Sequence, residues 1–209
     1  MLAALVAVVL AAPAGTIELT PTDDIWVYPH ASDPQKDGYL RVWGVDGSAV
    51  ASDPQMADEY SYSYLKFNVS KVPKDAKVRS VKLLLTHTPD PAWAAADSKA
   101  APLEARLLAK DFSEKQWEFG SAKTIYPAAA KEAILGTAYA GKLEAGKPTV
   151  FEMDLTKASS KLLGKSDDLL IALTSALNPS AIGNRAVYKF YSKDYDKAEY
   201  RPKLVVETD

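Results

Sequence analysis

The stretch YSYSYLKFNV, residues 60–69, decides the fold class of this chain. Its apolar side chains alternate, so that Leu65, Phe67 and Val69 fall on one face. The opposite face carries three tyrosines and a lysine: Tyr60, Tyr62, Tyr64 and Lys66. A period of two is typical of a β-strand that buries one face in a core. We expect neighbouring strands or loops to cover the tyrosine stripe, and the alternative is an open platform for a ligand.

Further segments along the chain share this strand-like pattern. They are residues 17–19, 24–28, 39–43, 81–85, 103–108, 149–155, 168–174, 187–192 and 203–207. Turn dipeptides separate several of them, with Asp-Pro at 33–34 and 53–54 and Asp-Gly at 37–38 and 46–47. About ten short strands at this spacing predict an all-β chain, either a sandwich or a barrel.

Helical signal is weak and confined to the connections. The Ala-rich residues 127–140 are expected to hold two or three helical turns. Residues 156–164 are expected to form one short helix, with Thr156 as N-cap and Gly164 as the stop. Residues 89–102, rich in Pro and Ala, are expected to form a long surface loop that carries Trp93. No shift in composition divides residues 15–209, so we expect a single domain.

The first fourteen residues, MLAALVAVVLAAPA, differ from the rest of the chain. They carry no charge, and their apolar run is too short to span a bilayer. They end in Ala12-Pro13-Ala14, an A-x-A cleavage pattern, although no Lys or Arg precedes the apolar run. We interpret residues 1–14 as a secretory signal peptide and expect a secreted or cell-surface protein without a membrane span.

Composition excludes several classes of function. The chain of 209 residues has 25 Lys and Arg against 27 Asp and Glu, a net charge of -2, which argues against nucleic acid as the main partner. It has no Cys, which excludes disulfides, thiolate metal sites and a cysteine nucleophile. The motifs G-x-S-x-G, H-E-x-x-H and a Gly-rich phosphate loop are absent, so we do not expect an enzyme.

The sequence has few signals of a metal site. Its two histidines, His30 and His87, are too few for a multi-histidine cage, and His87 is expected to be packed and hydrogen-bonded rather than a base. We expect no cofactor. A structural calcium ion stays open, because carboxylates of residues 23–24 and 194–196 would supply oxygen ligands if they met in space.

Short motifs, in order along the chain, carry a resemblance to one family. They are residues 22–27 (TDDIWV), 64–73 (YLKFNVSKVP), 76–85 (AKVRSVKLLL), 112–114 (FSE), 151–156 (FEMDLT), and 190–195 (FYSKDY) with 200–206 (YRPKLVV). This ordered set resembles the DNRLRE, or disaggregatase-related, domains, which overlap carbohydrate-binding module family 96. Phe112 stands where that family usually has Trp, and the Ala-rich residues 90–102 and 127–147 also depart from its pattern.

The resemblance implies both a fold and a class of function. Such domains are jelly-roll-like antiparallel β-sandwiches on secreted bacterial and archaeal proteins, often joined to polysaccharide lyases or hydrolases. One branch of them binds alginate. The resemblance therefore implies a non-catalytic module that binds polysaccharide, with an anionic polymer such as alginate among the expected ligands.

The segment HASDPQKDGYLRVW, residues 30–43, is the candidate binding site. The candidate residues are His30, Lys36, Tyr39, Arg41 and Trp43. Aromatic faces stack on sugar rings, and Arg binds a carboxylate with two parallel hydrogen bonds. The resemblance implies that basic residues of this loop and strand take part in binding. The alternative is a solvated loop followed by an ordinary strand, with Trp43 at the rim of the sandwich.

Two other functions remain open at this point. A structural or adhesive protein of the cell envelope would suit the same export signal and the same strands. A small lyase or hydrolase would need a carboxylate pair at catalytic spacing, which sequence alone does not reveal. Among the remaining charged residues, Arg201 is expected to make a structural ion pair near the C-terminal strand.

Overall fold

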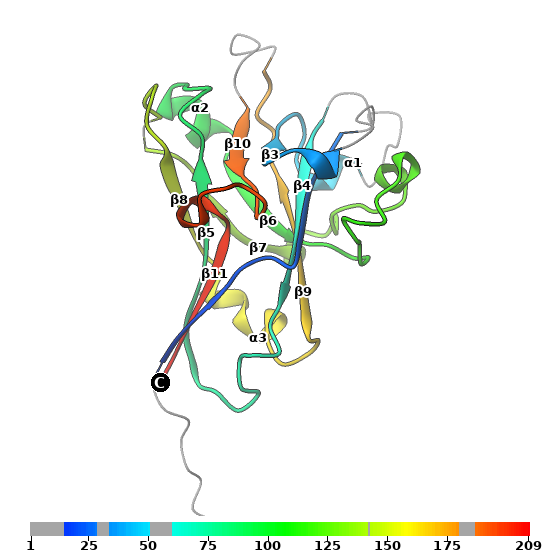
Figure 1. Cartoon of the computed structure of the whole chain (residues 1–209), viewed down its shortest axis with the longest axis vertical. Coiled ribbons are helices and arrows are strands. Elements are labelled where there is room, and N and C mark those ends of the chain that lie inside the picture. The colour runs from blue at the N-terminus through cyan, green and yellow to red at the C-terminus, as the bar shows by residue number, and fades with distance from the viewer. Residues whose placement is uncertain (1–14, 29–33, 51–59, 142, 180–186) are drawn as a thin grey trace, which may run out of the picture.

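The computed structural model describes residues 15–28, 34–50, 60–141, 143–179 and 187–209 (Figure 1). These residues form two antiparallel sheets with short helices in the connections. The predicted all-β sandwich is confirmed. The expected signal peptide, residues 1–14, lies outside the described residues.

The first sheet is built around β5 (Val78–His87). Its other strands are β1 (Gly15–Leu19), β3 (Tyr39–Val42), β8 (Thr149–Asp154), β10 (Tyr188–Tyr191) and β11 (Lys203–Thr208). Strands β11 and β10 pair in succession with one edge of β5, and β8 pairs with the opposite edge. Strand β1 pairs with β11, and β3 pairs with β10.

The second sheet has the strand order β2-β4-β9-β6-β7. Its strands are β2 (Asp23–Val27), β4 (Tyr62–Asn68), β6 (Leu103–Leu107), β7 (Ile134–Ala138) and β9 (Asp168–Thr174). The apolar run of β9 lies at the centre of the sheet, with side chains of both faces largely buried. This is the position that its uninterrupted hydrophobicity predicts.

The helices are short and lie between strands. They are α1 (Gly47–Val50), α2 (Ala95–Ala100), α3 (Ser159–Leu162) and the 3-10 helices η1 (Pro34–Lys36), η3 (Phe119–Lys123), η4 (Lys131–Ala133), η5 (Thr156–Ala158) and η6 (Ala198–Tyr200). The short helix expected over residues 156–164 is confirmed as η5 and α3, and Gly164 ends it with a φ of 78°. Thr156 is not its N-cap, because its hydroxyl accepts a hydrogen bond from the Val81 N–H instead.

Two expectations about the connections are wrong. Residues 127–140 do not form a helix of two or three turns: η4 is one turn, and the residues after it form edge strand β7, paired with β6. Pairing with β6 outweighs the helical preference of the alanines. Residues 89–102 are not simply a surface loop, because α2 forms there. Trp93 packs on the core, with its ring centroid 4.8 Å from that of Tyr188.

The main core lies between the two sheets. Leu65, Phe67 and Val69 face it from β4 and the residue just after that strand, as their alternation predicts. Opposite them, the first sheet contributes buried residues such as Leu83 and Phe190. Each fully buried side chain of this size stabilises the fold by about 1.5–3 kcal/mol through the hydrophobic effect.

A second apolar cluster covers the outer face of the second sheet. The tyrosine stripe of residues 60–64 packs there against Phe112, Trp117 and Ile125 from the long connection that follows β6. The hydroxyl of Tyr64 donates a 2.8 Å hydrogen bond to the carbonyl of Ile125. All three tyrosines are buried, so the packing interpretation is confirmed and the ligand platform is wrong.

Gly136 marks a close approach between β7 and β8. A methyl group built on Gly136 would lie 2.7 Å from the carbonyl oxygen of Asp154 and 2.7 Å from the side chain of Leu155. We expect Gly136→Ala to lower the free energy of unfolding by about 1–3 kcal/mol, because the two sheets must separate locally. Urea denaturation measures this loss.

Gly141→Ala is the matched control, since a methyl group there meets nothing within 4 Å. Its free energy of unfolding should stay within about 0.5 kcal/mol of wild type. Equal losses in the two variants would contradict the close approach as the cause.

Candidate functional site: an aromatic and basic surface at the seam of the sandwich

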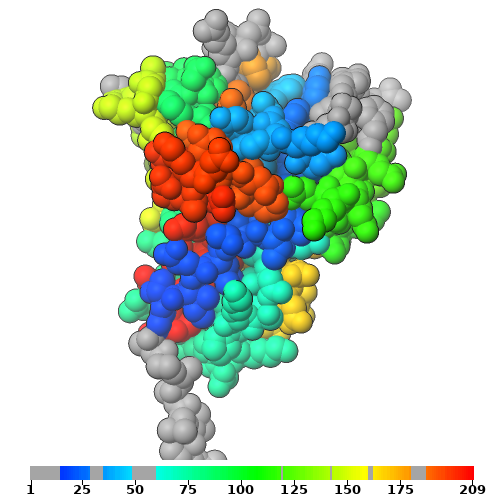
Figure 2. Space-filling view, viewed as in Figure 1, coloured from blue at the N-terminus to red at the C-terminus, as the bar shows by residue number. Residues whose placement is uncertain are grey.

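The edge strands β2 and β3, one from each sheet, lie side by side along one margin of the sandwich. The hydroxyls of Ser61 and Ser63 both donate hydrogen bonds to the backbone carbonyl of Arg41, at 3.0 and 2.9 Å. Trp43 and Ser61 form an isolated antiparallel bridge. We call this margin the seam. In Figure 2 the light-blue segment that includes β3 adjoins the orange-red residues around 190–200 on the face in view.

The predicted alternation along β3 is confirmed. Leu40 and Val42 are buried in the main core, and Tyr39, Arg41 and Trp43 are half-buried on the outer side. This follows from the period of two along a strand.

Of the two remaining candidate residues, the structure describes only Lys36. Lys36 ends η1 and is exposed. His30 lies outside the described residues. The structure thus brings three of the five candidates onto one surface and places Lys36 in the turn that leads to it.

Two aromatic residues that the sequence reasoning missed belong to the same surface. Trp26 and Tyr28 come from β2 and the residue after it, where they alternate with core residues. The rings of Trp26 and Tyr28 are stacked, with centroids 6.3 Å apart, and Tyr28 is 5.9 Å from Trp43. The Arg41 guanidinium carbon lies 4.6 Å from the centre of the Trp26 ring, a cation–π contact across the seam.

A cluster of tyrosines continues this surface on the first sheet. Its members are Tyr39, Tyr191, Tyr195 and Tyr200, and neighbouring ring centroids lie 4.2 to 6.3 Å apart. The Lys189 ammonium lies 4.2 Å from the centre of the Tyr39 ring. Only Tyr39 was anticipated, because the other three come from the far end of the chain, in β10 and the loop after it.

Two cations face outward at the middle of the surface. Arg41 and Lys189 are directly opposite each other in the β3–β10 pair, and like charges in that position repel. Arg41 forms an ion pair with Asp37. Lys189 forms no ion pair with any carboxylate among the described residues. Burial, and then the Arg41 charge, lower the pKa of Lys189.

We call the residues Trp26, Tyr28, Tyr39, Arg41, Trp43, Lys189 and Tyr195 the seam surface. It combines flat aromatic rings with two adjacent cations. Rings of this kind stack on pyranose rings, and adjacent cations attract carboxylate or sulfate groups. The arrangement is therefore suited to an anionic sugar polymer.

Three carboxylates meet beside residues of the seam surface. One oxygen each of Asp24, Glu114 and Asp194 lies within 4.8 Å of the others. The Lys193 ammonium forms ion pairs with Glu114 at 2.8 Å and Asp194 at 2.6 Å. The buried carboxylate of Asp24 accepts a 2.6 Å hydrogen bond from the Lys193 N–H. Burial raises the pKa of Asp24 to about 7.

This cluster does not fit a calcium site. The sequence anticipated the meeting of Asp24 and Asp194 but missed Glu114, and Asp196 does not take part. The Lys193 ammonium already pairs with Glu114 and Asp194, and calcium needs six to eight oxygen ligands. Three of the quoted motifs converge here, namely those at residues 22–27, 112–114 and 190–195. In this structure they join segments that are distant in the sequence.

Two other residues named in the sequence analysis, His87 and Arg201, hold parts of the fold together. His87 is fully buried, with its ring nitrogens 2.7 and 3.3 Å from the carbonyl oxygens of Thr88 and Val187. Burial lowers the pKa of His87, and the two carbonyl contacts offset this only in part. Arg201 forms no ion pair with any carboxylate in the described part of the chain, contrary to expectation, and its Nε donates to the Tyr195 carbonyl, which holds the tyrosine loop.

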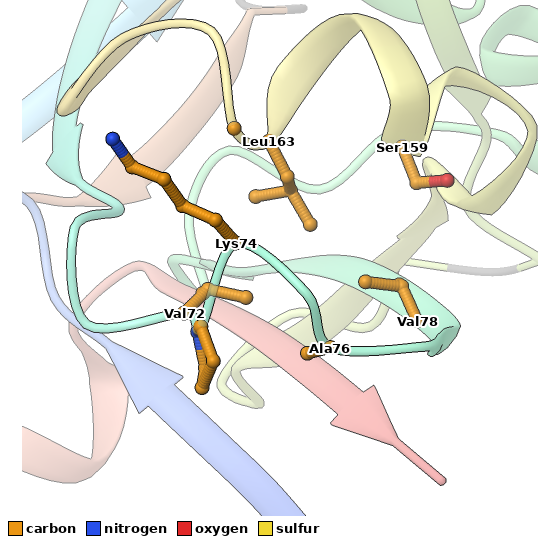
Figure 3. A pocket seen from close by; sticks show the side chains of 8 residues that line it. Val72, Lys74, Ala76, Val78, Ser159 and Leu163 are labelled. Carbon is orange, nitrogen blue, oxygen red and sulfur yellow. The ribbon is translucent and has the colours of Figure 1, made fainter. Parts of the chain in front are cut away.

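A pocket of about 260 Å³ opens elsewhere, between the turn after β4 and α3 (Figure 3). Leu163 and Ser159 line it on one side and Val72 and Val78 on the other, and the Lys74 side chain extends outward at its flank. It shares no residue with the seam surface. None of the helices in the described part of the chain is both long and apolar enough to cross a membrane.

Comparison of the sequence with models of known families and with curated proteins found no match. The resemblance to the DNRLRE domains therefore stays a prediction that rests on the quoted motifs.

We expect Asp24→Asn to change how stability depends on pH. The folded-state pKa of Asp24, about 7, lies above the ordinary value of 3.8, so the folded protein holds this proton more tightly than the unfolded chain. The resulting stabilisation is complete below about pH 4 and is lost as the pH rises through 7. Asparagine mimics the protonated acid and does not titrate. The stability of the variant relative to wild type should therefore be greater at about pH 8 than at about pH 5. Urea denaturation at both pH values measures the gain.

The exposed Asp196→Asn is the matched control, because it removes the same charge outside the cluster. Its difference from wild type should change much less between the two pH values. A pH-independent difference for Asp24→Asn would show that the carboxylate titrates normally in the folded protein.

Proposed function

We propose that this protein is a secreted, non-catalytic carbohydrate-binding module whose ligand is an anionic polysaccharide such as alginate. In this respect it would be similar to the DNRLRE domains and to carbohydrate-binding module family 96. The ligand would lie along the seam surface, across the edges of both sheets.

The observation that carries the proposal is the position of Arg41 and Lys189 between two groups of aromatic rings. Trp26, Tyr28 and Trp43 lie on one side, and the tyrosine cluster lies on the other. A sugar ring stacked on either group would bring its acidic substituent toward the cation pair. An anion there would relieve the repulsion between the two side chains.

The titratable groups of the fold support a binding role over a catalytic one. His87 has both ring nitrogens against backbone carbonyls in a fully buried position. The carboxylates of Glu114 and Asp194 are held by Lys193. A general acid or base must reach the substrate within hydrogen-bonding distance. These groups are committed to the protein's own structure instead.

Affinity electrophoresis tests the proposal on the protein without residues 1–14. Alginate and polygalacturonate in the gel should retard it, and retardation should weaken as ionic strength rises. Neutral xylan and hydroxyethyl cellulose should retard it less.

Other results would point to other functions. Absence of retardation by every polymer would refute the proposal. A persistent oligomer that is indifferent to sugars would favour a structural or adhesive protein. Release of unsaturated uronates or reducing ends would indicate a lyase or hydrolase.

The double variant Lys36→Ala with Arg41→Ala should lose at least tenfold in affinity for a uronate polymer, about 1.4 kcal/mol. Both side chains are at least partly exposed, so the fold should stay intact. Lys189→Ala should also weaken binding, because it removes the second cation of the pair. Isothermal titration calorimetry with alginate oligomers measures these changes.

Lys82→Ala is the matched control, since Lys82 lies on the outer face of the same sheet, paired with Glu152 on β8. Its affinity should equal that of wild type. If all four proteins bind equally well, the ligand does not use the seam surface.

A further inference from the structure

Asp37 places a carboxylate inside the seam surface. It lies in the turn before β3, four residues ahead of Arg41, and forms an ion pair with the Arg41 guanidinium. The side chains of Asp37 and Arg41 are 26% and 29% exposed, so the pair is open to solvent and to a ligand.

A backbone hydrogen bond holds the turn that carries Asp37. The carbonyl of Gly38, the next residue, accepts a 3.0 Å hydrogen bond from the N–H of Ser192. This bond fixes the turn against the end of β10.

Arg41 is likewise held without Asp37. Its backbone is paired with β10, and its carbonyl accepts hydrogen bonds from the hydroxyls of Ser61 and Ser63. Its guanidinium lies on the Trp26 ring. Removing the Asp37 charge should therefore leave the guanidinium near its present position, with more of its hydrogen-bonding capacity free.

We infer that Asp37 is a specificity-determining residue, an internal counter-ion that an anionic polysaccharide must displace from Arg41. This rests on the proposed function of the seam surface. Asp37 competes only with acidic groups of a ligand and leaves aromatic stacking unaffected. It therefore lowers affinity for anionic polymers and not for neutral ones.

The consequence is selection for closely spaced charges. A polymer with one acidic group at the site must break the Asp37–Arg41 pair or use Lys189 alone. A polymer with an acid on every sugar offers one group to Lys189 while another competes for Arg41. The Asp37 charge also acts on Lys189, whose pKa it raises against the larger lowering effects of burial and Arg41.

The expected size of the effect follows from the exposure of the pair. Solvent-exposed ion pairs contribute about 0.2–1 kcal/mol, which corresponds to a change in affinity of up to about fivefold. We expect Asp37→Asn to bind polygalacturonate and alginate about two- to fivefold more tightly than wild type at low ionic strength. Its binding to hydroxyethyl cellulose should not change.

The experiment compares wild type with Asp37→Asn and Asp37→Ala by calorimetry and affinity electrophoresis. Thermal denaturation confirms that each variant is folded. Glu152→Gln is the matched control, because it removes one exposed carboxylate from the outer face of the same sheet, away from the seam. If Glu152→Gln raised the affinity as much as Asp37→Asn does, the gain would come from the change in net charge alone. That result would overturn the inference.

A double-mutant cycle isolates the pair. The gain from Asp37→Asn should disappear when Arg41 is already alanine. A gain that persists without Arg41, or an Asp37→Asn variant that binds as wild type or more weakly, would overturn the inference while leaving the proposed function intact. If neither wild type nor the variants bind any polymer, both the proposed function and the inference are wrong.

Discussion

The backbone carbonyl of Arg41 accepts hydrogen bonds from the hydroxyls of Ser61 and Ser63, and this contact joins the edge of one sheet to the other. Edge strands expose unpaired backbone groups, which a folded protein must cover. Here Ser61 and Ser63 cover part of the β3 edge, and the strand they belong to or adjoin, β4, pairs with β2. As a result, Trp26 of β2 lies beside Arg41 of β3, although they belong to different sheets. The seam surface exists because the sandwich is closed at this margin.

The acidic cluster of Asp24, Glu114 and Asp194 joins three distant segments through hydrogen bonds and ion pairs. The Asp24 carboxylate accepts a hydrogen bond from the backbone N–H of Lys193. The backbone N–H of Asp24 donates a hydrogen bond of 3.3 Å to the Glu114 carboxylate. Glu114 in turn binds the Lys193 ammonium. Burying carboxylates is costly unless they are paired and hydrogen-bonded, and here each one has a partner. The cluster thus fixes the loop that carries Tyr195 and Tyr200 against β2, and with it the position of the tyrosine cluster.

The second sheet is apolar on both faces, whereas the outer face of the first sheet is largely polar. Its inner face packs in the main core, and its outer face packs under the connection that follows β6. The first sheet instead carries cross-strand ion pairs on its outer face, such as Lys203 with Glu18 and Lys82 with Glu152. Exposed pairs of this kind contribute little stability. The seam surface lies outside the second cluster, and its aromatic rings stay partly exposed beside the Asp37–Arg41 ion pair.

The sequence by itself determined the strands and their inward faces, because alternation with a period of two is a local property that burial enforces. It therefore predicted the core positions of β4 and the outward positions of Tyr39, Arg41 and Trp43. It could not predict β7, where pairing with β6 outweighs the preference of the alanines for helix. Nor could it show which residues cover Tyr64, that Trp26 and Lys189 belong to the same surface as Arg41, or that Lys193 pairs with the acidic cluster. These relations join residues up to 169 positions apart, as in the bond from Lys193 to Asp24, and only the packing of the two sheets brings them together.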